Sequence, residues 1–267
     1  MDYESLKSTK LFVFDMDGTI FLGGKPFPEA IDFINYLRET GRKFLFFTNN
    51  ASTNKDFLID KLTKMGFGPS KSEIMSSADV TIKFLNLHRR GKKIYLLGTE
   101  LLKKQFADGG IEFSDDAEIT VTSFDTSLTY EKLTKTCTLI RNGSEFLCTH
   151  PDFNCPTEDG FLPDSGAIAA AVTAATNVLP TYFGKPYRAT LEMISEYMGV
   201  EPEKICFIGD RLYTDIAVSK SIPEHPALSI LVMTGETTPE MAERAQGSEK
   251  PDFIFENLAE LKKVMND

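Results

Sequence analysis

Three short runs of consecutive apolar residues constrain the fold of this chain more than any other feature. They are Leu11–Phe14, Phe44–Phe47 and Ile205–Ile208, and each is followed by polar residues or glycine. A run without polar alternation suits a strand that is covered on both faces of a parallel sheet. A helix is expected between the first two runs, at Pro28–Thr40, where apolar residues recur at helical spacing before Gly41. The pattern predicts an α/β fold with a doubly wound, mostly parallel Rossmann-like core.

The middle of the chain has enough alternating helix and strand patterns to form a domain of its own. These patterns run from an expected helix at 78–87 to an Ala-rich one at 166–177. The stretch is roughly 100 residues long, within the usual size of a domain. We therefore expect a discontinuous core, residues 1–79 and 180–267, with an inserted α/β domain at residues 80–179.

Composition limits the partners that such a chain can have. Lys plus Arg is 29 and Asp plus Glu is 39, so the formal net charge is 29 − 39 = −10. An acidic chain without a basic stripe is a poor ligand for nucleic acid or for an anionic membrane. The 4 cysteines lack zinc-ligand spacing, and no apolar run approaches the roughly 20 residues of a membrane span. We therefore expect a cytoplasmic protein with reduced thiols.

The first apolar run leads directly into Asp15-Met16-Asp17-Gly18-Thr19. Ligands of open parallel sheets bind outside the carboxyl ends of the strands, which is where Asp15 is expected. Two carboxylates spaced by two residues on extended backbone point to the same side, and they repel unless a cation or a proton neutralises them. Taken alone, the motif is also compatible with a solvated turn.

Three further motifs follow in order along the chain. Thr48 and Asn49 end the second apolar run, Lys185 lies between Gly184 and Pro186 ahead of an expected helix, and Asp210 follows the third run with Asp215 five residues later. Each has an ordinary explanation, as a helix cap or a solvated side chain. The conjunction, with three strand ends and one lysine near a helix N-terminus, favours a site for an anion and a cation.

This motif set resembles that of the haloacid dehalogenase-like hydrolase superfamily. The long insertion after the second motif is similar to that of the NagD-like branch, subfamily IIA, which carries a large α/β cap of the C2 type. The likeness covers nearly the whole chain and extends to residues 149–152, 209–216 and 231–238. The chain departs from the family pattern between Ala217 and Ile230, where Pro223 and Pro226 predict a longer, rigid loop of unassigned role.

The resemblance implies a phosphatase that hydrolyses small phosphate monoesters through an aspartyl-phosphate. Asp15 is expected to attack phosphorus, and Asp17 to protonate the leaving oxygen and later to accept a proton from water. The expected cofactor is Mg²⁺, with Asp15, Asp210 and the main-chain carbonyl of Asp17 as ligands. Asp215 would bind a metal-bound water or orient Lys185, and the residues leave open which.

Substrate contacts are expected on both sides of the phosphate ester bond. Thr48, Asn49 and Lys185 would hold the phosphoryl oxygens. The inserted domain would exclude water and contact the leaving group through its loop at 149–164, with Asp152 and Asn154 as candidates. His150 is expected to be a hydrogen-bonded structural residue, because the mechanism already has an acid and a base.

Other functions fit the residues less well. A dinucleotide-binding dehydrogenase needs a glycine-rich fingerprint that the sequence around Asp15 lacks, and signalling receiver domains are about half this length or less with a differently placed acceptor. Mutases of the superfamily usually carry a helical cap, for which residues 20–47 leave no room. A catalytically weak or inactive scaffold that binds phosphorylated ligands stays open as an alternative. The expected partner is a small phosphorylated metabolite of unassigned identity, and exposed faces of the inserted domain could support a homodimer.

Overall fold

The computed structural model describes residues 3–157 and 160–266. Contacts within the chain divide it into two compact units, which are described one by one. The core unit comprises Met1–Phe47, Ile59–Met75 and Lys185–Asp267, and the inserted unit comprises Thr48–Leu58 and Ser76–Gly184.

A six-stranded sheet forms the centre of the core unit, in the order β14-β13-β12-β1-β4-β5. The pairings of β1 with β4 and β12, and those along β12, β13 and β14, are all parallel. The strands are β1 (Leu11–Phe14), β4 (Lys43–Thr48), β5 (Ile74–Ser76), β12 (Ile205–Gly209), β13 (Leu228–Val232) and β14 (Phe253–Phe255). This arrangement confirms the predicted α/β class with a doubly wound core.

The strand order changes direction between β1 and β12. From β1 the chain first adds β4 and β5 on one side, and later adds β12, β13 and β14 on the other. In open α/β sheets, ligands bind at such a switch point, beyond the carboxyl ends of the strands. The register pairs Phe14 with Ile208, so the residues that follow β1 and β12 leave the sheet side by side.

Burial explains why the apolar runs form the central strands. All four residues of β1 and all five of β12 are buried, as expected for strands covered on both faces. Phe14 makes edge or tilted ring contacts with Phe33 and Phe46, whose ring also contacts Phe67. This aromatic packing supplies much of the core beneath β1 and β4.

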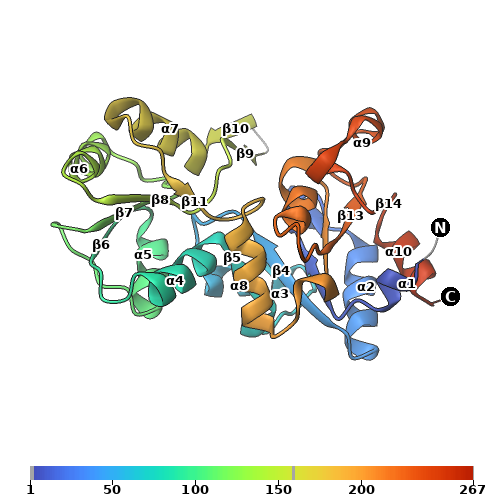
Figure 1. Ribbon diagram of the computed structural model, residues 1–267. Helices are drawn as coiled ribbons and strands as arrows, with labels where there is room; N and C mark the ends of the chain where they lie inside the picture. The colour runs from blue at the N-terminus through green and yellow to red at the C-terminus, as the bar shows by residue number, and fades with distance from the viewer. Residues whose placement is uncertain (1–2, 158–159, 267) are drawn as a thin grey trace. The chain divides into compact units, whose positions relative to one another are not determined.

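Helices cover the core sheet. Figure 1 shows α2 beside α10, and the Tyr36 hydroxyl of α2 donates to the carbonyl of Met265 in α10 at 3.1 Å. The α-helices with residues in this unit are α1 (Glu4–Lys7), α2 (Pro28–Glu39), α3 (Lys55–Lys64), α8 (Arg188–Met198), α9 (Pro239–Arg244) and α10 (Leu258–Asn266), of which α3 crosses the boundary between the units. A short antiparallel pair, β2 (Phe21–Leu22) and β3 (Lys25–Pro26), follows the first motif.

The inserted unit has its own four-stranded parallel sheet, in the order β11-β8-β7-β6. Its strands are β6 (Ile94–Leu97), β7 (Ile119–Thr122), β8 (Glu145–Cys148) and β11 (Thr181–Tyr182). The helices α4 (Ser77–His88) and α5 (Glu100–Asp108) lie on one face, with α6 (Tyr130–Arg141) and α7 (Ser165–Thr176) on the other.

Two features of the inserted unit differ from the sequence expectation. The expected loop at 149–164 contains an antiparallel hairpin, β9 (Asn154–Thr157) and β10 (Gly160–Pro163). In addition, residues 48–58, 76–79 and 180–184 group with the inserted unit, whereas residues 80–179 were expected to form it. Within the first of these segments, the carbonyls of residues 49, 51 and 52 accept hydrogen bonds from side chains of the inserted unit, as described below.

The proline-containing segment that departs from the family pattern lies before β13, at the amino edge of the core sheet. It follows two short helical turns, Leu212–Ile216 and Ala217–Lys220. Ile222 is buried, residues 223–226 are exposed, and the amide of Ala227 donates to the carbonyl of Ser219 at 2.9 Å. The loop therefore lies at the end of the sheet opposite to the carboxyl ends of the strands.

Among the described residues, no helix has the length and apolar character needed to cross a membrane.

Candidate active site

Three carboxylates meet at the switch point of the core sheet. Asp15 follows β1, Asp210 follows β12, and Asp215 comes from the helical turn after β12. One oxygen from each lies within 4.8 Å of the others. Two of the three are nearly inaccessible to water, because Asp210 and Asp215 are each 2% exposed. The adjacent strands thus bring together residues that are about 200 positions apart in the sequence.

Lys185 supplies a positive charge inside this cluster. Its side chain is buried, and its ammonium forms ion pairs with Oδ1 of Asp15 and, at 2.6 Å, with Oδ1 of Asp215. Burial acts to lower the pKa of Lys185, but the two carboxylates outweigh burial and raise the pKa above its ordinary value. The lysine is therefore held as a cation next to Asp15.

The negative charge of the cluster exceeds what Lys185 neutralises. Burial, together with the charges of Asp215 and Asp210, raises the pKa of Asp15 to about 8, although Lys185 acts against this shift. Burial and the charge of Asp215 likewise raise the pKa of Asp210 to about 6. A site made of carboxylate oxygens with excess negative charge fits a hard divalent cation such as Mg²⁺.

Close main-chain approach fixes the side chain of Asp210. A Cβ atom added to Gly18, whose φ is +84°, would lie 2.4 Å from Oδ2 of Asp210, and one added to Gly235 would lie 2.0 Å from the same oxygen. The amide of Glu236 donates to this oxygen at 2.7 Å. The hydroxyl of Thr19 donates to the other carboxylate oxygen, Oδ1 of Asp210, at 3.4 Å. Only glycine at positions 18 and 235 leaves room for this carboxylate.

Asp17 stands apart from the three clustered carboxylates. Its side chain is exposed and is not a member of the cluster. Partial desolvation raises its pKa, while the positive charges of Lys61 and Arg211 act in the opposite direction. A raised pKa favours a protonated carboxyl, the state that a proton donor needs. Its expected metal-ligating atom is the main-chain carbonyl, and that assignment stays a prediction.

Arg211 is a charged residue of this site to which sequence reasoning gave no role. It is partly buried and forms an ion pair with Glu236 at 2.8 Å, and its amide donates to Oδ2 of Asp215 at 3.0 Å. The signal was present, because Arg211 directly follows the Asp of the third strand end. Its charge adds to that of Lys185 and reduces the excess negative charge around Asp210.

Thr48 ends β4, the strand beside β1, and Asn49 directly follows it; both group with the inserted unit. Oγ1 of Thr48 accepts a hydrogen bond from the amide of Asn50 at 3.1 Å, which leaves the hydroxyl proton of Thr48 to donate elsewhere. Nδ2 of Asn49 donates to both carboxylate oxygens of Asp152 at 3.3 Å. The sequence-predicted residues Asn49 and Asp152 are therefore in contact, whereas Asn154 is exposed at the start of β9.

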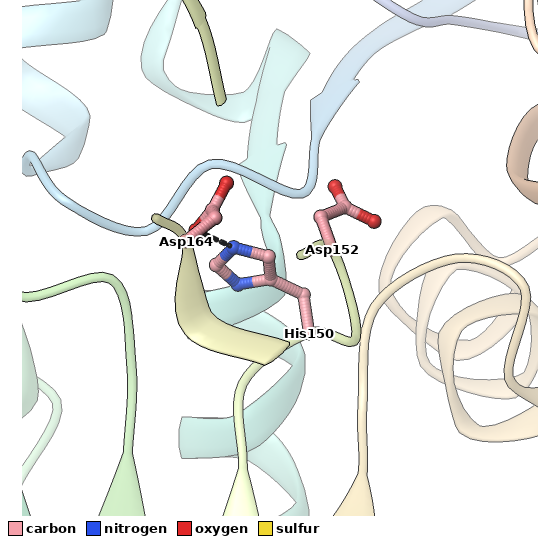
Figure 2. Close-up of side chains that lie close together, drawn as sticks. All are labelled: His150, Asp152 and Asp164. Carbon is pink, nitrogen blue, oxygen red and sulfur yellow. Dashed lines mark hydrogen bonds and ion pairs between the residues drawn. The ribbon is translucent and has the colours of Figure 1, made fainter. Parts of the chain in front are cut away.

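His150 lies within a buried polar network of the inserted unit. Figure 2 shows its ring between Asp164 and Asp152, with Nε2 at 2.8 Å from Oδ1 of Asp164. Its other ring nitrogen lies 2.9 Å from the hydroxyl of Thr149. Asp164 also caps α7 by accepting from the amide of Ser165 at 2.6 Å. One ligand atom each from His150, Asp152 and Asp164 could come together around a metal, but these bonds give both ring nitrogens a structural partner, as expected for His150.

Comparison with known proteins adds to this geometry. Residues 12–112 match the model of a haloacid dehalogenase-like hydrolase family, and residues 182–261 match a second, related hydrolase family of the same kind. An acid sugar phosphatase of Staphylococcus saprophyticus is 32% identical over 97% of this chain and 99% of its own length.

Solved structures agree with these matches. A 4-nitrophenylphosphatase from Thermotoga maritima is 41% identical, covers 98% of this chain and 99% of its own, and superposes with a TM-score of 0.92. A protein described as a putative NagD protein is 37% identical over 97% of this chain and 99% of its own, with a TM-score of 0.87.

Proposed function

The chain belongs to the haloacid dehalogenase-like hydrolases, in their NagD-like branch, and from this premise we propose that it hydrolyses small phosphate monoesters through an aspartyl-phosphate. The observation that carries the proposal is the convergence of Asp15, Lys185, Asp210 and Asp215 at the switch point of the core sheet. Carboxylates and an ammonium at this place can receive a phosphoryl group together with a divalent cation.

Asp15 is the proposed nucleophile. One of its oxygens forms a bond to phosphorus while the bond from phosphorus to the ester oxygen breaks. The attacking group must be ionised, and the ammonium of Lys185 beside Oδ1 favours that form. Because burial raises the pKa of Asp15 to about 8, the carboxylate also depends on further positive charge at the site.

Mg²⁺ is the proposed source of that charge. Asp15, Asp210 and the main-chain carbonyl of Asp17 would hold it, since all three offer the oxygen ligands that Mg²⁺ prefers. A bound Mg²⁺ would offset the negative charge shared by the carboxylates and the phosphoryl group. Asp215 is paired with Lys185, which favours the orienting role for Asp215 among the two that the sequence left open.

Asp17 is the proposed acid and base. Its proton passes to the ester oxygen as the leaving group departs, and the resulting carboxylate then takes a proton from water. That water oxygen bonds to phosphorus of the aspartyl-phosphate, and the bond to Asp15 breaks to release inorganic phosphate. The raised pKa of Asp17 supports the first of these steps.

The remaining residues are proposed to select and hold the ester. Thr48, Asn49 and Lys185 would donate to the phosphoryl oxygens. The inserted unit would act as a C2-type cap, with Asp152 and Asn154 facing the leaving group. The named relatives act on sugar phosphates and on 4-nitrophenyl phosphate, which makes sugar phosphates and aryl phosphates the first two classes to test.

A phosphate-release screen over sugar, nucleotide, glycerol and aryl phosphates, with Mg²⁺ or with a chelator, tests the proposal. We expect release that requires the divalent cation and is abolished in Asp15→Asn, which keeps the size of the side chain but not its charge. Release that persists in Asp15→Asn would remove the proposed nucleophile. Binding of phosphate esters without any release would instead favour the inactive scaffold.

A further inference from the structure

The main chain that follows β4 is held by three hydroxyl groups of the inserted unit. Within Thr48–Ser52, here called the phosphate loop, the carbonyl of Asn49 accepts from Oγ of Ser77 at 2.6 Å. The carbonyl of Ala51 accepts from Oγ of Ser123 at 3.3 Å, and that of Ser52 accepts from Oγ1 of Thr99 at 2.8 Å. Three of the loop's carbonyl groups therefore have a side-chain donor from another part of the chain.

The three donors come from separate elements and are all buried. Ser77 is the first residue of α4, Thr99 precedes α5 as its N-cap, and Ser123 directly follows β7. Ser77 and Ser123 are fully buried, and Thr99 is 9% exposed. Hydroxyls in such places have few rotamers open to them, so they fix the positions of the carbonyls more strictly than exposed hydroxyls would.

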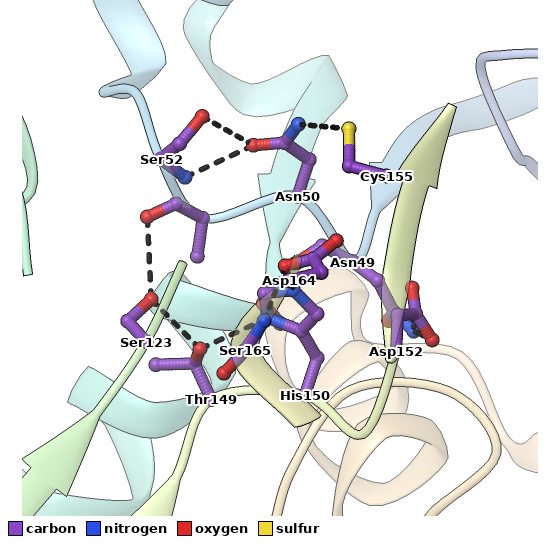
Figure 3. A network of polar contacts seen from close by, with 12 residues as sticks. Asn49, Asn50, Ser52, Ser123, Thr149, His150, Asp152, Cys155, Asp164 and Ser165 are labelled. Atoms are coloured by element: carbon purple, nitrogen blue, oxygen red, sulfur yellow. Dashed lines mark hydrogen bonds and ion pairs between the residues drawn. The ribbon is translucent and has the colours of Figure 1, made fainter. Parts of the chain in front are cut away.

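A second layer of polar contacts orients two of these donors. Oγ of Ser123 lies 2.9 Å from the hydroxyl of Thr149, which in turn lies 2.9 Å from Nδ1 of His150. The same ring nitrogen is 3.4 Å from Oγ of Ser77. Figure 3 shows this network running from Asp164 and His150 through Thr149 and Ser123 to the loop.

Side chains of the loop itself also help to hold its main chain in place. Oδ1 of Asn50 accepts from the amide of Ser52 at 2.9 Å and from its hydroxyl at 2.7 Å. Nδ2 of Asn50 approaches Sγ of Cys155 in β9 at 4.0 Å. The loop is thus held by the sheet, the helices and the hairpin of the inserted unit, with which it groups.

We propose that Ser77, Thr99 and Ser123 are positioning residues for phosphoryl binding, which they support by fixing the main chain that carries Thr48 and Asn49. This inference rests on the proposed function, because it takes these two residues as donors to the phosphoryl group. A loop that is already ordered loses less conformational entropy when it binds an anion, and so binds it more tightly. Ser77, Thr99 and Ser123 would then strengthen the binding of phosphate without touching it.

The test compares variants by their inhibition by inorganic phosphate and by their KM and kcat for 4-nitrophenyl phosphate and glucose 6-phosphate. Ser77→Ala and Ser123→Ala each remove one donor. We expect the inhibition constant for phosphate and both KM values to rise together by about fivefold, the factor of one ordinary hydrogen bond, with kcat changed less than about twofold. If KM rises equally for both esters, the variants weaken binding of the phosphoryl group, which the two esters share. An effect on binding of the leaving group would differ between them.

The matched control is Thr81→Val. Thr81 is also fully buried on α4, and its hydroxyl donates to the carbonyl of Ser77 within the helix at 2.8 Å, so its loss affects stability without removing a donor to the loop. Should Ser77→Ala fail to fold, Thr99→Val and its conservative counterpart Thr99→Ser form the second pair, of which only the valine variant should weaken phosphate binding.

Thr48→Val separates failure of this inference from failure of the proposed function. Weaker phosphate inhibition in Thr48→Val and in the loop-donor variants, but not in Thr81→Val, supports the inference. Weaker inhibition in Thr48→Val alone overturns the inference and leaves the proposed function standing. Unchanged inhibition in Thr48→Val refutes the proposed phosphate-binding role of Thr48, and the inference falls with it.

Discussion

A methyl group added at Gly235 should disturb the proposed metal site without changing any charge. In the structure, a Cβ atom at this position would lie 2.0 Å from Oδ2 of Asp210, whereas real Cβ atoms keep at least 3.0 Å from such neighbours. In Gly235→Ala, the carboxylate or the loop must therefore move by at least 3.0 − 2.0 = 1.0 Å. A displacement of about 1 Å at a reacting centre can cost about 100-fold in rate.

We expect Gly235→Ala to lower kcat/KM by about that factor and to raise the Mg²⁺ concentration that gives half-maximal activity. The free energy of unfolding should fall by only about 1–3 kcal/mol, the usual cost of overpacking. The assay is phosphate release across a Mg²⁺ titration, with thermal unfolding measured on the same samples.

Gly199→Ala is the control for the loss of a glycine. Gly199 ends α8 with a φ of +62°, and a Cβ atom there would have nothing within 4 Å. A side chain in this conformation costs about 1–2 kcal/mol, so the control should lose stability and keep its activity. A folded Gly235→Ala protein with unchanged activity and unchanged Mg²⁺ dependence would refute the view that Asp210 must sit in this position.

Three further predictions follow from the charges and the buried network. The pKa of Asp15 rises from 3.8 to about 8 on folding, so between these pH values the metal-free folded state binds more protons than the unfolded state. The thermal stability of the metal-free protein should therefore fall as the pH rises from about 4 to 8, and it should fall less steeply in Asp15→Asn. Mg²⁺ should stabilise the protein most near pH 8, the upper end of this range. Asp17→Asn should slow release of the leaving group in single-turnover assays by about 10²–10⁴-fold for sugar phosphates and by less for 4-nitrophenyl phosphate, whose leaving group needs no proton, and equal losses in this first step would count against an acid role. His150→Ala should destabilise the protein by about 1–3 kcal/mol because Asp164 loses its buried partner, and denaturant unfolding that shows no loss would contradict the structural role.

The part of the site that could be predicted from the sequence is the part built on strand ends. Apolar runs identify parallel strands, and the carboxyl ends of neighbouring strands meet, so the proximity of Asp15 to Asp210 follows from their places after two such runs. Lys185 could be added because it precedes an expected helix, whose N-terminus attracts anions, and because the other three motifs accompany it.

The features that could not be predicted depend on tertiary contacts. The hydrogen bonds from the hydroxyls of Ser77, Thr99 and Ser123 to the main chain of residues 49–52 could not be predicted, because no sequence pattern connects these three residues with that loop. The β9–β10 hairpin was missed because proline and polar residues dominate its sequence. Arg211 follows the third strand end in the sequence, but its ion pair with Glu236 and its effect on Asp210 depend on the tertiary structure.

The proline-containing loop before β13 gives the core a surface that is separate from its chemistry. Residues 223–226 are exposed at the amino edge of the sheet, while the clustered carboxylates follow the opposite ends of the strands. Loop residues of this kind tolerate inserted sequence when the backbone around them stays hydrogen-bonded, as it does here through Ser219 and Ala227. A fluorescent label or an immobilisation tag placed between Pro223 and Pro226 should therefore leave the activity of the enzyme unchanged.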